Sequence, residues 1–312
     1  TVQGYYAPSD VMHHTDLPHS PCYLNGRYLR LDRARVSVMD RGFLFGDGVY
    51  EVIPAYEGRL FCFEQHIDRL ERSLDAIRLT NPHSRTQWRQ IASNLIAKFD
   101  RFLLGTGQKT GSTAENSLVY LQVTRGVALR DHALPADVTP TVFAMCSRLR
   151  PVSQEVRAHG ATCVSANDIR WHKAHIKSTS LLGAVLSRQV SADVNAQETI
   201  LFRDDTLTEA SSSNVWVVKD GAIWGTPRNE SVLEGIRYGL MERLCRELGL
   251  PFGLRPLVRA DVERADELLL TSASKEVLAV TRLDGKPVGN GLPGPIYDRL
   301  FAAYQLAKQQ PA

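Results

Sequence analysis

Residues 40–51 read Asp40-Arg-Gly-Phe-Leu-Phe-Gly-Asp-Gly-Val-Tyr-Glu51, a polar, glycine-rich stretch that runs into an apparent strand. Three later stretches share its mixture of charged and small residues: Thr124-Arg-Gly-Val-Ala-Leu-Arg-Asp-His132, Asp168-Ile-Arg-Trp-His-Lys-Ala-His-Ile-Lys177 and Thr208-Glu-Ala-Ser-Ser-Ser-Asn-Val-Trp216. Together they supply a candidate nucleophilic lysine, a glutamate of the kind found buried, anion-binding arginines and glycines that expose the backbone. This combination is typical of enzymes that hold an organic cofactor.

Length and composition set the outer limits of the interpretation. The chain has 312 residues, of which 43% are hydrophobic and 23% charged, so we expect a globular protein with two lobes, residues 1–150 and 151–312. The net charge of +3 is not concentrated in a basic stripe, which argues against nucleic acid as a partner. Five scattered cysteines and the lack of a long apolar run predict a cytoplasmic protein with no disulfide frame and no membrane span.

The chain alternates between strand and helix patterns without regular β-α-β spacing. Asn25-Gly26 and Glu57-Gly58 are hairpin signals, and apolar residues recur at helical spacing over residues 64–79 and 86–104. Strands are expected at 117–125 and 140–147, and a polar linker at 148–157. The first lobe is therefore predicted to be α+β with antiparallel pairing, preceded by an extension over residues 1–20 and interrupted by a loop at 104–117. For the second lobe we expect strands at 161–170 and 266–271, a strand pair turned at Asp220-Gly221, and helices at 180–193, 236–248 and 295–308.

Lys177 is the candidate nucleophile. It follows Ala174-His-Ile176, predicted to end a strand, and precedes Ser178-Thr-Ser180, a helix N-cap signature. An amine at a strand-to-helix junction, partly removed from water, is suited to attack a carbonyl. The alternative is a surface lysine, and position alone leaves both open.

Glu209 precedes the run Ser211-Ser-Ser-Asn214. One interpretation is a surface carboxylate in a turn. The other is a carboxylate that faces the pyridine nitrogen of pyridoxal phosphate and keeps it protonated, with small hydroxylated neighbours leaving room for the ring.

Arg69 ends His66-Ile-Asp-Arg69 on a predicted helix. It is either a surface ion-pair partner of Asp68 or Glu71, or a bidentate clamp for a phosphate group.

Taken in order, the motifs resemble those of the fold-type IV pyridoxal-phosphate transaminases, and most of all the D-amino acid aminotransferases of bacteria. The resemblance runs from about residue 22 to residue 300. It rests on residues 40–51, His66-Ile-Asp-Arg-Leu70, Val123-Thr-Arg-Gly126, Asp168-Ile-Arg-Trp171, Ile176-Lys-Ser178, Leu181-Leu-Gly-Ala-Val-Leu186 and Thr208-Glu-Ala-Ser-Ser-Ser-Asn214.

The resemblance implies an α+β, two-lobed fold and a pyridoxal 5'-phosphate cofactor. Lys177 would carry the cofactor as a Schiff base and move the α-proton, Glu209 would hold the pyridine nitrogen and Arg69 the phosphate. The backbone amides of Ile236 and Ala273 would add to the phosphate site. Arg237 stands where relatives commonly have threonine and would supply charge in place of a hydroxyl. Further cofactor contacts are expected from Ser212, Ser213, Asn214, Leu233 and Ser272.

The resemblance also implies how substrate is held. Tyr50, Arg130 and His132 match the residues that grip the substrate α-carboxylate in D-amino acid aminotransferases, the arginine and histidine coming from the other subunit of a homodimer. The implied reaction is ping-pong transfer of an amino group between a D-amino acid, such as D-alanine or D-glutamate, and a 2-oxo acid, such as 2-oxoglutarate or pyruvate.

Several alternatives stay open at this point. Within the same fold they are a branched-chain L-amino acid aminotransferase, an (R)-amine transaminase and an aminodeoxychorismate lyase. Ser272-Ala-Ser-Lys275 fits the Ser-x-x-Lys pattern of acyl-transfer hydrolases, although the accompanying Lys109-Thr-Gly111 lies in a polar loop and in the wrong order. His172 and His175 lack a third ligand nearby, so we expect no metal site.

Overall fold

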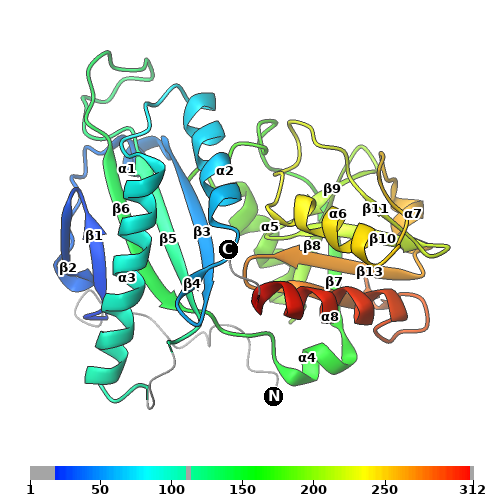
Figure 1. Ribbon diagram of the computed structural model, residues 1–312. Helices are drawn as coiled ribbons and strands as arrows, with labels where there is room; N and C mark the ends of the chain where they lie inside the picture. The colour runs from blue at the N-terminus through cyan, green and yellow to red at the C-terminus, as the bar shows by residue number, and fades with distance from the viewer. Residues whose placement is uncertain (1–17, 110–113, 310–312) are drawn as a thin grey trace. The chain divides into compact units, whose positions relative to one another are not determined.

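The computed structural model describes residues 18–109 and 114–309 (Figure 1). Residues 1–17 of the predicted extension at 1–20 and residues 110–113 of the predicted loop at 104–117 lie outside these residues. The chain divides into two units: the first ends at Leu149 and includes Lys177–Ser180, and the second comprises Arg150–Ile176 and the chain from Leu181 onward. By its contacts, the segment that carries Lys177 thus belongs with the first unit, whereas the sequence placed it in the second lobe.

The first unit is built on an antiparallel sheet. Its described strands have the order β2-β1-β6-β5-β3-β4. The predicted hairpins at Asn25-Gly26 and Glu57-Gly58 are present, and both asparagine and glutamate adopt the positive φ that such tight turns require. The strands are β1 (Pro21–Leu24), β2 (Arg27–Arg30), β3 (Gly48–Tyr56), β4 (Arg59–Leu60), β5 (Ser117–Thr124) and β6 (Thr141–Arg148).

Two long helices cover this sheet. Helix α2 (Phe63–Ala76) packs on β3, and α3 (Arg85–Gly105) packs on β1, β5 and β6 (Figure 1). Helix α3 begins with a capping box at Ser84, and its apolar stripe from Trp88 to Leu103 is buried. In α2 the buried face also carries His66, Arg69 and Ser73, so polar groups lie on the side that faces β3.

The glycine-rich stretch at 40–51 folds around Asp40. This buried carboxylate caps helix α1 (Arg41–Phe45) by accepting from the amide of Gly42 at 2.8 Å, and it also accepts from the hydroxyl of Thr124 at 2.7 Å. The helix ends at Gly46, whose φ is +65° and whose missing Cβ would lie 2.7 Å from Ser180 Oγ. The glycine is required both by the turn and by the close approach of the Lys177–Ser180 segment.

The predicted strand end and N-cap around Lys177 are wrong. Strand β7 (Ala161–Asn167) ends well before Lys177, and helix α5 (Leu182–Asp193) has Leu181 at its N-cap with no side-chain capping bond. The hydroxyls of Thr179 and Ser180 donate instead to the carbonyl of Gly46, at 2.9 and 3.1 Å. A tertiary partner therefore satisfies the groups that local sequence assigned to a helix cap.

The second unit contains a larger, mixed sheet. Its described strands follow the order β12-β11-β10-β13-β14-β7-β8-β9, with β15 on β14. The pairs β14–β7, β7–β8 and β11–β12 are parallel and the others antiparallel. Besides β7, the strands are β8 (Glu198–Arg203), β9 (Thr206–Ala210), β10 (Asn214–Lys219), β11 (Ala222–Gly225), β12 (Phe252–Leu254), β13 (Glu267–Ser272), β14 (Glu276–Leu283) and β15 (Lys286–Pro287).

Helices pack against this sheet at several places. Helix α5 contacts β7 and β8, and α8 (Pro295–Gln309) contacts β13 and β14, as Figure 1 shows for α8. Helix α6 (Arg237–Glu247) contacts α8 and β12. The predicted linker at 148–157 contains the start of α4 (Gln154–His159), capped by Ser153, and α7 (Arg259–Glu263) was not predicted. The expected α+β fold class is confirmed.

Among the residues described, none of the helices combines the length and the apolar character that crossing a bilayer requires.

Candidate active site

Lys177 lies beside Tyr50 in the first unit. Its segment runs antiparallel to the start of β3, since Tyr50 N–H donates to the Lys177 carbonyl at 3.0 Å and Thr179 N–H donates to the Gly48 carbonyl at 2.9 Å. The Lys177 amide donates to Ser73 Oγ at 3.3 Å. Its Nζ atom lies 4.2 Å from the centre of the Tyr50 ring, and both side chains are half-buried. The lysine is thus fixed at its backbone and presents its amine over an aromatic face.

Arg69 of α2 is buried next to Glu51, the residue that follows Tyr50 on β3. Its Nε and Nη2 atoms donate to the two Glu51 oxygens at 2.6 and 2.8 Å, and His66 Nδ1 lies 2.7 Å from Glu51 Oε2. One of the two interpretations, a surface ion pair with Asp68 or Glu71, does not hold, because Arg69 is buried and binds Glu51, whereas those two carboxylates bind Arg85. Glu51 orients the guanidinium, which is the usual arrangement for an arginine that recognises a further anion. The phosphate role of Arg69 stays a prediction.

Arg130 and His132 lie on the segment that follows β5, and both are exposed to solvent. Each contacts Phe45 of α1: the Arg130 guanidinium carbon is 5.3 Å from the ring centre, and the two rings of His132 and Phe45 are 5.4 Å apart. Between them, the Asp131 carbonyl accepts from the buried Arg41 at 2.5 Å. The segment is therefore anchored at its centre, while its two functional candidates project outward.

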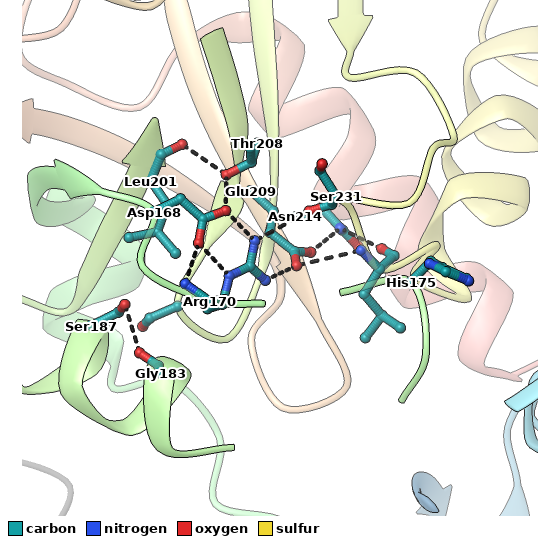
Figure 2. Close-up of polar contacts among 12 residues, drawn as sticks. Asp168, Arg170, His175, Gly183, Ser187, Leu201, Thr208, Glu209, Asn214 and Ser231 are labelled. Carbon is teal, nitrogen blue, oxygen red and sulfur yellow. Dashed lines mark hydrogen bonds and ion pairs between the residues drawn. The ribbon is translucent and has the colours of Figure 1, made fainter. Parts of the chain in front are cut away.

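Glu209 lies at the centre of a buried polar cluster in the second unit (Figure 2). Its Oε1 atom accepts from Arg170 Nη1 and, at 3.4 Å, from the Leu233 amide. Its Oε2 atom accepts from Asn214 Nδ2 at 3.2 Å. Arg170 also donates to Asp168 at 2.9 and 2.8 Å through Nε and Nη2. Glu209 is not the surface carboxylate that its position in a turn allowed.

The electrostatics of this cluster make Glu209 unusual. Burial raises the pKa of the Glu209 carboxyl, and the opposing charge of Arg170 does not fully cancel that effect. By contrast, Arg170 lowers the pKa of Asp168 despite its burial. A second cationic or N–H group at Glu209 would favour its ionised form, and Oε2 has a lone pair to accept one.

The two backbone amides expected to bind phosphate lie at the start of a helix and in the turn between two strands. Ile236 is the N-cap residue of α6, and Ala273 lies in the turn between β13 and β14. The Leu233 carbonyl accepts from Asn214 Nδ2 at 3.0 Å, which links this region to Glu209. Arg237 is buried and its Nη2 donates to the Tyr304 hydroxyl at 2.9 Å, so its observed contact lies within the second unit between α6 and α8.

The serines after Glu209 bind a second buried carboxylate, and the cofactor contacts expected of Ser212 and Ser213 stay a prediction. The hydroxyls of Ser211, Ser212 and Ser213 all donate to Glu198, the last two at 2.7 and 2.9 Å. Lys275 Nζ also binds Glu198, at 2.7 Å. They do not simply leave space beside Glu209, because each hydroxyl is used to hold a second buried carboxylate.

This arrangement disfavours the Ser-x-x-Lys hydrolase. In such an enzyme the lysine amine takes a proton from the serine hydroxyl. Here the Lys275 ammonium is paired with Glu198, and Ser272 Oγ accepts from the backbone amide of Lys275 at 3.1 Å.

Comparison with known proteins agrees with this geometry. Residues 48–283 match the family described as amino-transferase class IV. The D-alanine aminotransferase of Staphylococcus aureus (strain MSSA476) is 35% identical over 285 residues, which are 91% of this chain and 96% of that protein. The D-alanine aminotransferase of Bacillus licheniformis is 35% identical over 281 residues, 90% of this chain and 94% of that protein.

Solved structures show the same fold. The branched-chain amino acid aminotransferase from Escherichia coli has a TM-score of 0.80 at 22% identity, covering 92% of this chain and 93% of that chain. A hypothetical aminotransferase from Mycobacterium tuberculosis in its PLP-bound form has a TM-score of 0.77 at 21% identity, covering 93% and 99% of the two chains.

The chain belongs to the class IV aminotransferases. It is a pyridoxal-phosphate-dependent enzyme of fold type IV. Each unit carries groups that fit that cofactor: the first has a half-buried amine, and the second has a buried carboxylate with a spare lone pair and a helix start without a side-chain cap. Gly235, just before that helix start, has no room for a side chain: a Cβ would lie 2.0 Å from Asn214 Oδ1.

Sequence reasoning missed four polar residues that organise these clusters: Glu51, Arg170, Glu198 and Lys275. A signal existed only for Arg170, because Asp168-Ile-Arg170 forms a local turn in which the Arg170 amide donates to Asp168 Oδ1 at 3.0 Å. The other three bind residues outside their own stretch of sequence, and sequence spacing does not predict which residues those are.

Proposed function

We propose that this enzyme transfers an amino group between a D-amino acid, such as D-alanine or D-glutamate, and a 2-oxo acid, such as 2-oxoglutarate or pyruvate. The observation that carries the proposal is the placement of the Lys177 amine over the ring of Tyr50, 4.2 Å from its centre. It puts the reacting amine next to a residue assigned to the substrate carboxylate. The scattered, free cysteines support a cytoplasmic location.

Lys177 is the covalent attachment point of pyridoxal phosphate in this proposal. When bound, the cofactor supplies an electron-poor ring that accepts the electron pair released when the substrate Cα–H bond breaks. Lys177 Nζ takes the proton from Cα and returns one in the second half of the cycle. Its backbone is held by Tyr50 and Ser73, which limits the positions that the amine can reach.

Glu209 holds the proton on the ring nitrogen of the cofactor. Arg170 and Asn214 keep its carboxylate oriented, and Arg170 opposes the effect of burial on its ionisation. Arg69 and the amides of Ile236 and Ala273 bind the phosphate group.

Tyr50, Arg130 and His132 bind the substrate α-carboxylate. A carboxylate held on one side decides which Cα–H bond points at Lys177, so the D-enantiomer is the one deprotonated. In a single chain Arg130 and His132 are exposed to solvent, which supports their acting in the neighbouring subunit of a homodimer.

The surface of helix α5 also supports a homodimer. Leu182, Val185, Leu186 and Val190 have exposed fractions of 71%, 59%, 50% and 42%. These residues recur at helical spacing on one face, and a contiguous apolar face of this kind is typical of a subunit interface.

Donor specificity tests the reaction. Initial rates with 2-oxoglutarate are to be compared for D-alanine, L-leucine and a simple (R)-amine. We expect D-alanine to be the best donor. Activity with L-leucine alone would instead identify a branched-chain enzyme, and a preference for the amine would reject the carboxylate role of Tyr50. Borohydride reduction followed by peptide mapping should locate the cofactor on Lys177.

Subunit complementation tests the homodimer. Lys177→Ala and Arg130→Ala chains should each be nearly inactive alone. After they are unfolded together and refolded, about a quarter of the wild-type activity per site should return, because half of the dimers are mixed and each mixed dimer has one complete site. No recovery would place Arg130 in its own subunit's site.

A further inference from the structure

Glu198 and Lys275 form a buried ion pair in the second unit. The Glu198 side chain is fully buried at the start of β8, and the Lys275 side chain is 13% exposed. Lys275 Nζ lies 2.7 Å from Glu198 Oε2 and 2.9 Å from the hydroxyls of both Ser212 and Ser213. Every donor of the ammonium therefore has a partner.

The ion pair joins two turns that neighbour each other in the sheet. One is the turn at residues 211–213 between β9 and β10, and the other is the turn at residues 273–275 between β13 and β14. Strands β10 and β13 pair antiparallel, with Asn214 opposite Thr271, so both turns lie at the same end of these strands. Lys275 is the residue whose side chain crosses from the second turn to the first.

Both turns are bounded by groups assigned to the cofactor. Glu209 and Asn214 flank the serine turn, on β9 and β10, and hydrogen-bond to each other at 3.2 Å. Ser272 and Ala273 begin the other turn. A change in the spacing of the two turns would move the carboxylate that holds the ring nitrogen relative to amides that bind the phosphate.

The chemistry of the pair favours a fixed geometry. Burial alone would raise the pKa of Glu198, but Lys275 and the serine hydroxyls lower it to about 2. Glu198 is therefore charged at neutral pH, and a buried charge of this kind is stable only while its partners stay in place. Movement of either turn would leave a charge unpaired.

We propose that Lys275 is a positioning residue, whose ammonium clamps the 211–213 turn to the 273–275 turn through Glu198 and thereby sets the cofactor-binding geometry of the second unit. This inference rests on the proposed function, because it assigns Glu209 and Ala273 to the same cofactor. It adds a residue that touches neither cofactor nor substrate.

The test compares three variants. Lys275→Met keeps the apolar stem and removes the ammonium, and Lys275→Arg keeps the charge. Glu198→Gln combined with Lys275→Met removes both charges. No buried carboxylate is then left unpaired, but the ammonium that joins the two turns is still absent. Lys308→Met is the matched control, since Lys308 pairs with Glu276 at 2.7 Å in the same unit and joins α8 to β14 instead of the two turns.

Three quantities are to be measured on the purified holoenzymes: the dissociation constant of pyridoxal phosphate, the visible circular dichroism of the bound cofactor and the thermal midpoint. We expect Lys275→Met to raise the dissociation constant roughly 10- to 100-fold, the effect of losing one hydrogen bond to a charged group, and to weaken the visible signal. Lys275→Arg should restore most of both. The double variant should regain thermal stability without regaining cofactor affinity, and Lys308→Met should leave both cofactor measurements unchanged.

The outcomes separate the two proposals. If Lys275→Met binds the cofactor with wild-type affinity and an unchanged visible signal, and only its thermal midpoint falls, the pair is structural and the inference is overturned. If the single variant does not fold, the double variant decides by the same cofactor measurements. A wild-type protein that binds no pyridoxal phosphate overturns the proposed function and this inference with it.

Discussion

Arg170→Met perturbs the Glu209 cluster at one defined contact. The change removes the guanidinium that binds Glu209 Oε1, and the methionine side chain takes the place of the apolar stem of the arginine. Asp168 is not left bare, because Thr208 donates to it at 2.9 Å and Arg203 lies 3.2 Å away. The principal consequence is therefore a buried Glu209 without its cation.

The size of the effect follows from that contact. A hydrogen bond to a charged group contributes about 1.5–3 kcal/mol, and about 1.4 kcal/mol corresponds to one pKa unit. Burial already raises the pKa of Glu209, and Arg170 is the largest influence opposing it. The variant should therefore raise that pKa further. In the proposed function Glu209 must be ionised to hold the ring-nitrogen proton. As the pH is lowered, the variant should therefore lose activity at a higher pH than the wild type does.

The assay is kcat/KM for D-alanine with 2-oxoglutarate, measured as a function of pH. The acidic limb of the profile should move to higher pH, and the value at neutral pH should fall about 10- to 100-fold, the effect of losing one hydrogen bond to a charged group. Arg203→Met is the control, since Arg203 also pairs with Asp168 but, among the described residues, forms neither a hydrogen bond nor an ion pair with Glu209. An unchanged acidic limb in Arg170→Met, or an equal shift in Arg203→Met, would refute the reasoning.

Three further changes test the first unit. Glu51→Gln removes the buried carboxylate that pairs with Arg69 and should lower the unfolding free energy by about 3–5 kcal/mol in urea titrations. Burial would raise the pKa of Glu51, but Arg69 holds it well below its usual range. The stabilisation by this pair is therefore present above the ordinary carboxyl pKa, and the difference in unfolding free energy between wild type and variant should shrink as acid protonates the folded carboxyl. A difference that stays constant with pH would contradict the pairing. Ser84→Ala removes the cap of α3 and should reduce stability by about 1 kcal/mol, and no change in the urea midpoint would mean that the cap is not formed. Gly126→Ala combines a φ of +89° with a Cβ placed 2.0 Å from the Thr139 carbonyl, so the thermal midpoint should fall by several degrees, and an unaffected midpoint would exclude that backbone geometry.

Local patterns were sufficient for most of the first unit. The turns at Asn25-Gly26 and Glu57-Gly58 and the two apolar helix stripes arise from interactions within a few residues, and the structure has them close to their predicted bounds. Short helices such as α7 carry too few apolar residues for a periodicity to be visible.

The errors around Lys177 have a common cause. Ser178-Thr-Ser180 has the composition of a helix cap, yet its backbone pairs with β3 and its hydroxyls donate to Gly46. The same residue types can satisfy either partner, and the sequence does not record which one lies within reach. Arg69 shows the same limit, because its nearest carboxylates in sequence are not the one that it binds.

From its sequence alone, this chain could be assigned its fold class and its cofactor, because these depend on residue types in a fixed order along the chain. The tertiary structure decided which charges meet: Arg170 with Glu209, Arg69 with Glu51, and Lys275 with Glu198. The physical reason is that electrostatic and hydrogen-bond energies depend on distances of a few ångströms between atoms, and such distances between residues far apart in the chain exist only once the sheets have formed.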